Sequence, residues 1–156
     1  EFLLLHRLLQ KEHTRGILFE NWVRVQLPGH KPGISTDVFM PRSSSGTPLR
    51  LRPDNILEEG KGYTFYEYKH FVDPKTVINQ EDLDKIKAYA LAIRGGKKVF
   101  SYEGKPLTKV VYIFSNREGF LRNYSTIKEI ADDYNLENLN CFYLGIEKGQ
   151  LTLKNE

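Results

Sequence analysis

The chain has 156 residues and 40% hydrophobic content, enough for one hydrophobic core, so we expect a single domain over residues 1–156. Its net charge of +3 is compatible with a polyanionic partner but lacks the dense basic patches that announce one. One cysteine excludes an internal disulfide and a cysteine-rich zinc site, which leaves carboxylates, carbonyls and histidines to hold any metal.

The first part of the chain predicts a helix and no membrane segment. The apolar run FLLLHRLL is too short to span a bilayer and has no signal-peptide features, so we expect no membrane partner. The chain starts at Glu1 rather than methionine, which we interpret as a piece of a longer polypeptide. Over residues 13–29, apolar side chains recur at helical spacing until Pro28 and Gly29 stop the pattern.

The middle of the chain predicts strands. STDVFMP is typical of a short strand, and the serine-rich residues 42–48 form a loop. Residues 49–59 and 63–71 favour a hairpin across the turn at 60–62. Because side chains alternate along a strand, Glu67 and Lys69 should share one face. On the partner strand the same rule places four side chains together: Arg50, Arg52, Asp54 and Ile56.

The last part of the chain alternates helices and strands. Residues 75–96 form an amphipathic pattern that ends in two glycines. Its apolar side is made of Val77, Leu83, Ile86, Tyr89, Ala90 and Ile93. KVVYIFS predicts a buried strand, STIKEIADDY a helix, and NCFYLGIE a last strand. This order predicts an α/β fold with a central mixed sheet flanked by helices.

Three charged side chains should meet where the hairpin strands pair. Asp54 would lie near Glu67 and Lys69 at one end of the sheet. Two carboxylates and an amine suit metal-assisted phosphodiester hydrolysis, which needs hard oxygen ligands and a cation near the reacting phosphate. The same role explains why charges are tolerated among aromatic residues.

The stretch RPDNILEEGKGYTFYEYK resembles the signature of the PD-(D/E)XK nuclease superfamily, in which Pro-Asp on one strand precedes Glu-x-Lys on the next. The resemblance implies a restriction-endonuclease-like αβββαβ core covering most of the chain. It implies that Asp54 and Glu67 hold Mg²⁺ or Mn²⁺, with Zn²⁺ less expected, and that Lys69 assists the attacking water. It also implies further ligands in the side chain of Glu20 and the carbonyl of Tyr68, and a role for Gln80 on the following helix.

Several of these residues have a plainer interpretation. Glu67 and Lys69 could form an ion pair on a solvated edge strand, and Glu20 could pair with Arg24 one helical turn later. Asp37 is a rival ligand without the neighbouring proline, and His70 faces away from Glu67. Candidate nucleic-acid contacts are Lys31, Arg42, Arg50, Arg52 and Gln80. The plainer interpretation is scattered surface charge for the four basic residues, and a helix cap or a water-facing side chain for Gln80.

The sequence therefore predicts a metal-dependent endonuclease acting on DNA in preference to RNA. Its size resembles the C-terminal toxin domains of bacterial polymorphic and contact-dependent inhibition systems. That resemblance implies secretion or delivery into a target bacterial cytoplasm, and a cognate immunity protein. Two alternatives stay open. One is a DNA-repair or Holliday-junction-resolving nuclease, cytoplasmic and homodimeric; the other is a non-catalytic module that binds nucleic acid or protein.

Overall fold

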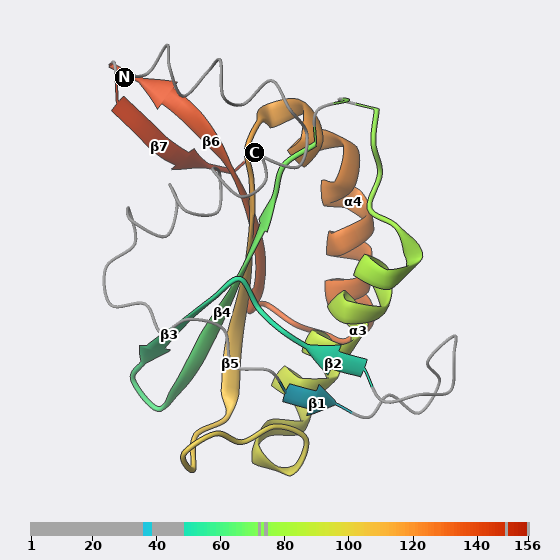
Figure 1. Cartoon of the computed structure of the whole chain (residues 1–156), viewed down its shortest axis with the longest axis vertical. Coiled ribbons are helices and arrows are strands. Elements are labelled where there is room, and N and C mark those ends of the chain that lie inside the picture. Colours follow the sequence, from blue (N-terminus) through green and yellow to red (C-terminus); the bar gives the residue numbers. More distant parts are fainter. Residues whose placement is uncertain (1–35, 39–48, 72, 74, 149, 156) are drawn as a thin grey trace.

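The structure is a computed structural model that describes residues 36–38, 49–71, 73, 75–148 and 150–155. Its elements are labelled as in Figure 1. The strands are β1 Thr36–Val38, β2 Leu49–Leu51, β3 Asn55–Glu59, β4 Gly62–Lys69, β5 Leu107–Phe114, β6 Leu139–Glu147 and β7 Gln150–Lys154. The helices are α3 Gln80–Gly95, the short 3₁₀ helix η1 Gly96–Lys98, and α4 Arg117–Asp133.

A five-stranded mixed sheet forms the centre of the fold, in the order β3-β4-β5-β6-β7. Strands β4, β5 and β6 run parallel, while β3 and β7 are antiparallel to their neighbours. Helices α3 and α4 lie together on one side of this sheet (Figure 1). The predicted α/β class with a central mixed sheet and flanking helices is confirmed for the described residues.

The predicted hairpin is confirmed, but its first strand is shorter than expected. Strand β3 pairs with β4 from Asn55↔Tyr66 to Glu59↔Gly62. Gly60 takes φ 59° in the turn, and a Cβ at Gly62 would meet the Thr108 side chain at 2.3 Å. Both glycines are therefore required by the geometry.

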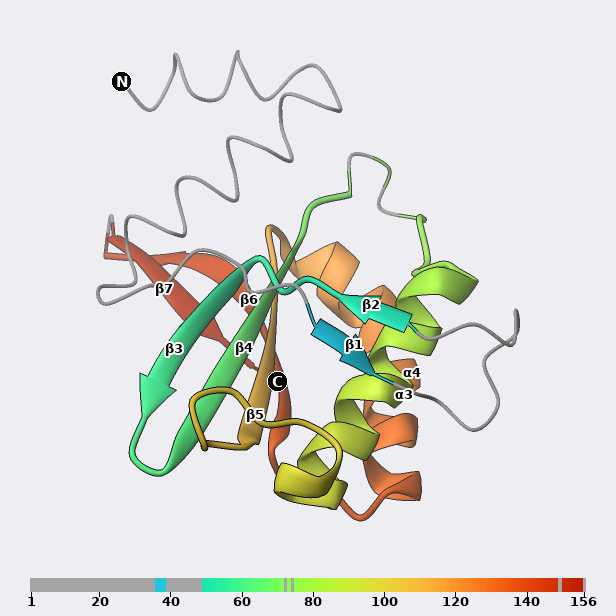
Figure 2. The same cartoon turned by 60° about the horizontal axis from the view of Figure 1, so that its bottom comes forward.

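The single strand predicted over residues 49–59 is wrong, because the chain breaks between β2 and β3. Pro53 lies at the break and has no N–H to donate to a ladder. Strand β2 pairs instead with β1 in a separate two-stranded sheet beside α3 (Figure 2). Arg50 belongs to that second sheet, and Arg52 and Asp54 lie between the two strands, so the predicted common strand face of Arg50, Arg52, Asp54 and Ile56 is wrong.

Helix α3 confirms the predicted crossover helix with a later start. The Asn79 side chain accepts a hydrogen bond from the Asp82 N–H and caps the first turn, and Gly96 at φ 61° ends the helix. Ile86 and Tyr89 are buried as predicted. Val77 is 60% exposed and precedes the helix, which contradicts its predicted place on the apolar side.

The C-terminal half contains more regular structure than the sequence indicated. Helix α4 begins at Arg117, well before the predicted STIKEIADDY segment, because Asn116 caps it by accepting the Gly119 N–H. The strands predicted around KVVYIFS and NCFYLGIE are confirmed as β5 and β6. Strand β7 was not predicted, and it extends the sheet beyond β6.

The alternation predicted for β4 is confirmed by two separate buried clusters. Tyr63 and Phe65 pack in the larger cluster with residues of α3 and α4. Tyr66 and Tyr68 pack in a smaller cluster with Val111 on the other face of the sheet. The face that carries Tyr63 and Phe65 therefore points toward the helices, and by alternation it also carries Glu67 and Lys69.

The helix predicted over residues 13–29 and the loop over 42–48 lie outside the described residues, as do Glu20, Lys31 and Arg42. In the part of the chain that the structure describes, no helix is both long enough and apolar enough to cross a membrane.

Candidate active site

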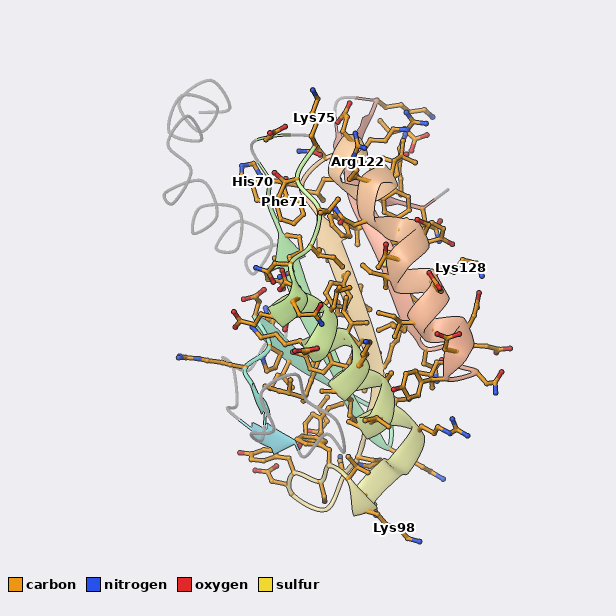
Figure 3. The ribbon with its side chains drawn as sticks, turned by 90° about the vertical axis from the view of Figure 1, so that its right-hand side faces the viewer. His70, Phe71, Lys75, Lys98, Arg122 and Lys128 are labelled. Atoms are coloured by element: carbon orange, nitrogen blue, oxygen red, sulfur yellow. The ribbon has the colours of Figure 1, made fainter. Side chains whose placement is uncertain are left out.

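The candidate site lies at the carboxyl end of β4, an interior strand of the sheet. Strands β4 and β5 run parallel and finish together, and the Ser115 N–H donates to the Lys69 carbonyl at 2.9 Å. In open α/β sheets, ligands bind outside the carboxyl ends of parallel strands. His70 and Phe71, just beyond the end of β4, mark this position in Figure 3.

Asp54 enters the site from the bend before β3. The last pair of the hairpin is Asn55↔Tyr66, so one further step along each strand brings Asp54 beside Glu67. The Asp54 Oδ2 atom accepts the backbone N–H of Tyr68 at 2.8 Å, which fixes the carboxylate against β4. Because the N–H and C=O of a strand residue point the same way, the Tyr68 carbonyl is directed to this side as well.

Glu67 is a buried carboxyl beside a second carboxyl. It is 6% exposed, on a strand flanked by β3 and β5. Burial, and after it repulsion from Asp54, raise its pKa to about 8, although Tyr89 and Lys69 oppose the shift. An ion pair on a solvated edge is therefore wrong for Glu67: β4 is an interior strand, and the carboxyl is withdrawn from water.

Lys69 reaches across to α3 rather than to its own strand. Its Nζ atom donates to Asp82 Oδ1 at 2.6 Å, and the two side chains are 18% and 17% exposed. Burial acts to lower the pKa of Lys69, but Asp82, together with Glu67 and Asp54, makes the net shift upward. With its pKa shifted upward, the Lys69 ammonium is suited to donate hydrogen bonds rather than to accept a proton.

Helix α3 also holds Glu67. The Tyr89 hydroxyl donates a short hydrogen bond to Glu67 Oε1. Asp82 and Tyr89 are seven residues apart and so lie on one face of the helix, about 10 Å apart along its axis. Their partners, Lys69 and Glu67, share one face of β4 about 7 Å apart. One helix face therefore fixes both strand side chains.

The Tyr89 hydroxyl gives a first prediction. We expect Tyr89→Phe to lower the free energy of unfolding by about 1–2 kcal/mol, because the buried Glu67 carboxyl loses its donor. Urea denaturation at pH 7 measures this loss. Tyr124→Phe is the control, since Tyr124 is half-buried and stacks on Phe120 through its ring. Equal stabilities for the two variants would show that the Tyr89 hydroxyl does not hold Glu67.

The side chains at the site are suited to a hard divalent cation. Asp54 and Glu67 supply carboxylate oxygens, and the Tyr68 carbonyl points to the same side, which is the donor set that Mg²⁺ and Mn²⁺ prefer over Zn²⁺. Within the described residues, no group of three His, Cys, Asp or Glu side chains could hold a metal. The predicted third carboxylate, Glu20, lies outside them.

Comparison with known proteins gives one match. No protein-family model matches the chain, and no curated protein matches it. Among solved structures, SfsA from Pyrococcus furiosus in complex with Ca²⁺ is similar at 14% identity, with a TM-score of 0.40 over 92% of this chain. The chain covers 61% of that protein. A TM-score of this size is a loose likeness, so what the chain does must follow from its own residues.

Other predicted site residues lie at or beyond the margin of the site. Gln80 is exposed at the start of α3 and donates to Asp84 Oδ1 at 2.9 Å along its own helix. Arg52 is exposed, and for Arg50 the structure describes only the backbone. Nucleic-acid contacts of these three residues stay predictions.

Asp37, the alternative to Asp54 as a metal ligand, and His70 both lie in described segments of the backbone. Asp37 pairs with Arg50 in the separate β1–β2 sheet, and its side chain is outside the described set. His70 shares a hydrogen bond with the Ser115 hydroxyl at 2.6 Å through its Nδ1 atom. Asp54, the candidate whose side chain the structure describes, lies close enough to Glu67 to raise its pKa.

Sequence reasoning missed Asp82 as a member of the site and treated Tyr89 only as an apolar residue. Asp82 occupies the first turn of α3, where an acidic side chain is ordinary because it complements the helix dipole. Tyr89 was placed correctly on the buried face, and a buried tyrosine hydroxyl usually finds a partner. From the sequence, this rule predicts that the Tyr89 hydroxyl has a hydrogen-bond partner, but it does not identify Glu67 as that partner.

Proposed function

We propose that the protein is a metal-dependent nuclease that hydrolyses phosphodiester bonds, with Asp54, Glu67 and Lys69 as its catalytic residues. The observation that supports this most directly is the pair of adjacent carboxyls, Glu67 buried near the end of β4 and Asp54 half-buried just before β3, with the Lys69 ammonium two residues beyond Glu67. Structural charges of this kind cost stability unless they are paired, so a purpose beyond folding is expected.

In the proposed site, Asp54 and Glu67 hold the divalent ion with the carbonyl of Tyr68. When bound, such an ion activates water and offsets charge on the phosphate oxygens. Lys69 donates hydrogen bonds to the attacking water or to a phosphate oxygen, where negative charge grows as the water oxygen bonds to phosphorus and the leaving oxygen departs. Asp54 stays in place through the Tyr68 N–H, and Glu67 through the Tyr89 hydroxyl.

The proposed function is tested by measuring cleavage of two substrates with and without divalent cations. Purified protein is incubated with plasmid DNA and, separately, with total tRNA, each with Mg²⁺, with Mn²⁺ or with EDTA. We expect cleavage of the plasmid that stops with EDTA. Cleavage of tRNA alone would change the substrate class. Intact substrates in every lane from a folded protein would favour the non-catalytic binding module.

The finer proposal is that this nuclease is a toxin domain of an interbacterial competition system with a cognate immunity protein. It rests on the size of the chain and on the PD-(D/E)XK resemblance. Induced expression in a bacterial cytoplasm should arrest growth for the wild type and spare it for Lys69→Met. A stable homodimer in light scattering, with cleavage restricted to branched DNA, would favour the repair nuclease instead.

A further inference from the structure

Lys69 lies within the electrostatic field of three carboxyl groups but pairs with one of them. Asp82, Glu67 and Asp54 all act on it. The ion pair, at 2.6 Å, is made with Asp82, and neither Glu67 nor Asp54 comes within ion-pair distance of Lys69 among the described residues. Lys69 pairs with Asp82 on the helix although Glu67 lies on the same strand face, about 7 Å along the strand.

The choice of partner matters because an ammonium and a divalent cation compete for the same oxygens. A lysine side chain is long and flexible, and its compact charge is drawn to the most negative position within reach. Asp54 and Glu67 form such a position when both are ionised. An ammonium seated between Asp54 and Glu67 would offset part of their negative charge and occupy the place that a divalent cation needs.

Asp82 is held firmly enough to keep Lys69 elsewhere. Its backbone N–H donates to the Asn79 side chain at 2.9 Å, so it belongs to a capped first helical turn. The positive end of the helix dipole stabilises a carboxylate there. The same helix is tied to β4 through the hydrogen bond between Tyr89 and Glu67. Asp82 therefore has a fixed place relative to the carboxyl pair.

We propose that Asp82 is a positioning residue that holds the Lys69 ammonium away from Asp54 and Glu67, so that this carboxylate pair binds a divalent cation instead of its own lysine. The inference rests on the proposed metal-dependent function. It assigns Asp82 no contact with the substrate. Its effect is on the affinity for the cation and on where the Lys69 ammonium points.

Direct binding of Mn²⁺, followed by electron paramagnetic resonance and calorimetry, tests this role without any substrate. We expect Asp82→Asn to weaken Mn²⁺ binding by about tenfold or more, as losses of supporting groups around metal sites do. The double variant Asp82→Asn with Lys69→Met should recover wild-type affinity within about threefold, because the competing ammonium is gone and the net charge of the site is unchanged.

Matched controls separate positioning from general effects of charge and folding. Glu81→Gln removes one carboxylate from the same helical turn, where Glu81 is 73% exposed and pairs with Lys85, and it should leave Mn²⁺ affinity unchanged. Asp82→Glu keeps a carboxylate and should retain most of the affinity. Circular dichroism confirms that each variant is folded before binding is measured.

Two results would overturn the proposal. If Asp82→Asn binds Mn²⁺ as well as Glu81→Gln does, Asp82 has only a structural role. If the double variant binds as weakly as Asp82→Asn, competition by Lys69 is not the cause. A wild type that binds no Mn²⁺ and cleaves nothing is a different outcome, because it removes the proposed nuclease function itself.

Discussion

We expect Lys69→Met to lower metal-dependent cleavage by about 10²–10³-fold, the usual cost of removing one donor that stabilises developing charge. Methionine keeps most of the apolar stem and removes the ammonium. The loss should fall on kcat rather than KM, since the ammonium acts on charge that develops in the transition state. Single-turnover cleavage of plasmid DNA measures it.

The control for Lys69→Met is Lys128→Ala. Lys128 forms an exposed ion pair with Asp132 on the outer side of α4, away from the end of β4 (Figure 3). It should cleave at the wild-type rate, because exposed pairs of this kind contribute little. If Lys69→Met cleaves within threefold of Lys128→Ala, Lys69 is not a catalytic residue.

Part of the site followed from local rules. The alternation of β4 and the tight turn at Gly60 were enough to bring Asp54 toward Glu67, because hairpin register is set by the turn. The prediction failed where the strand was extended through Pro53, although a missing N–H argues for a break there. The consequence falls on Arg50, which belongs to the other sheet, and on Arg52 and Asp54, which lie between β2 and β3.

The contacts made by α3 could not be predicted in the same way. That Asp82 meets Lys69 depends on how the helix is rotated and placed against the sheet, and such packing is set by many side chains at once. An acidic residue in a first helical turn has an ordinary explanation, which hides a second role. Strand β7 was missed because QLTLK is a short alternating segment whose partner comes only from the sheet.

The second large effect is on stability, at Glu67. Its pKa is raised from 4.5 to about 8 by burial and by Asp54, so the folded protein keeps a proton there that the unfolded chain has lost. Between about pH 5 and pH 8 the unfolded state binds fewer protons, and the free energy of unfolding falls as pH rises. Without a divalent cation, this loss is on the order of a few kcal/mol.

Glu67→Gln should remove this pH dependence, because its side chain is neutral at every pH and can still accept the Tyr89 hydrogen bond. In urea denaturation with EDTA, we expect the variant to match the wild type near pH 4 and to exceed its stability by a few kcal/mol at pH 9. Glu129→Gln, exposed on α4, is the control and should follow the wild type.

Addition of Mn²⁺ at pH 8 should instead raise the free energy of unfolding of the wild type more than that of Glu67→Gln. A cation that binds only the folded state stabilises it in proportion to the logarithm of its concentration, so the wild type should gain stability and Glu67→Gln should not. The variant should also lose cleavage. If Glu67→Gln is more stable than the wild type but inactive, the Glu67 carboxylate is needed for catalysis and not for folding. Equal gains with Mn²⁺ in both proteins would place the cation elsewhere.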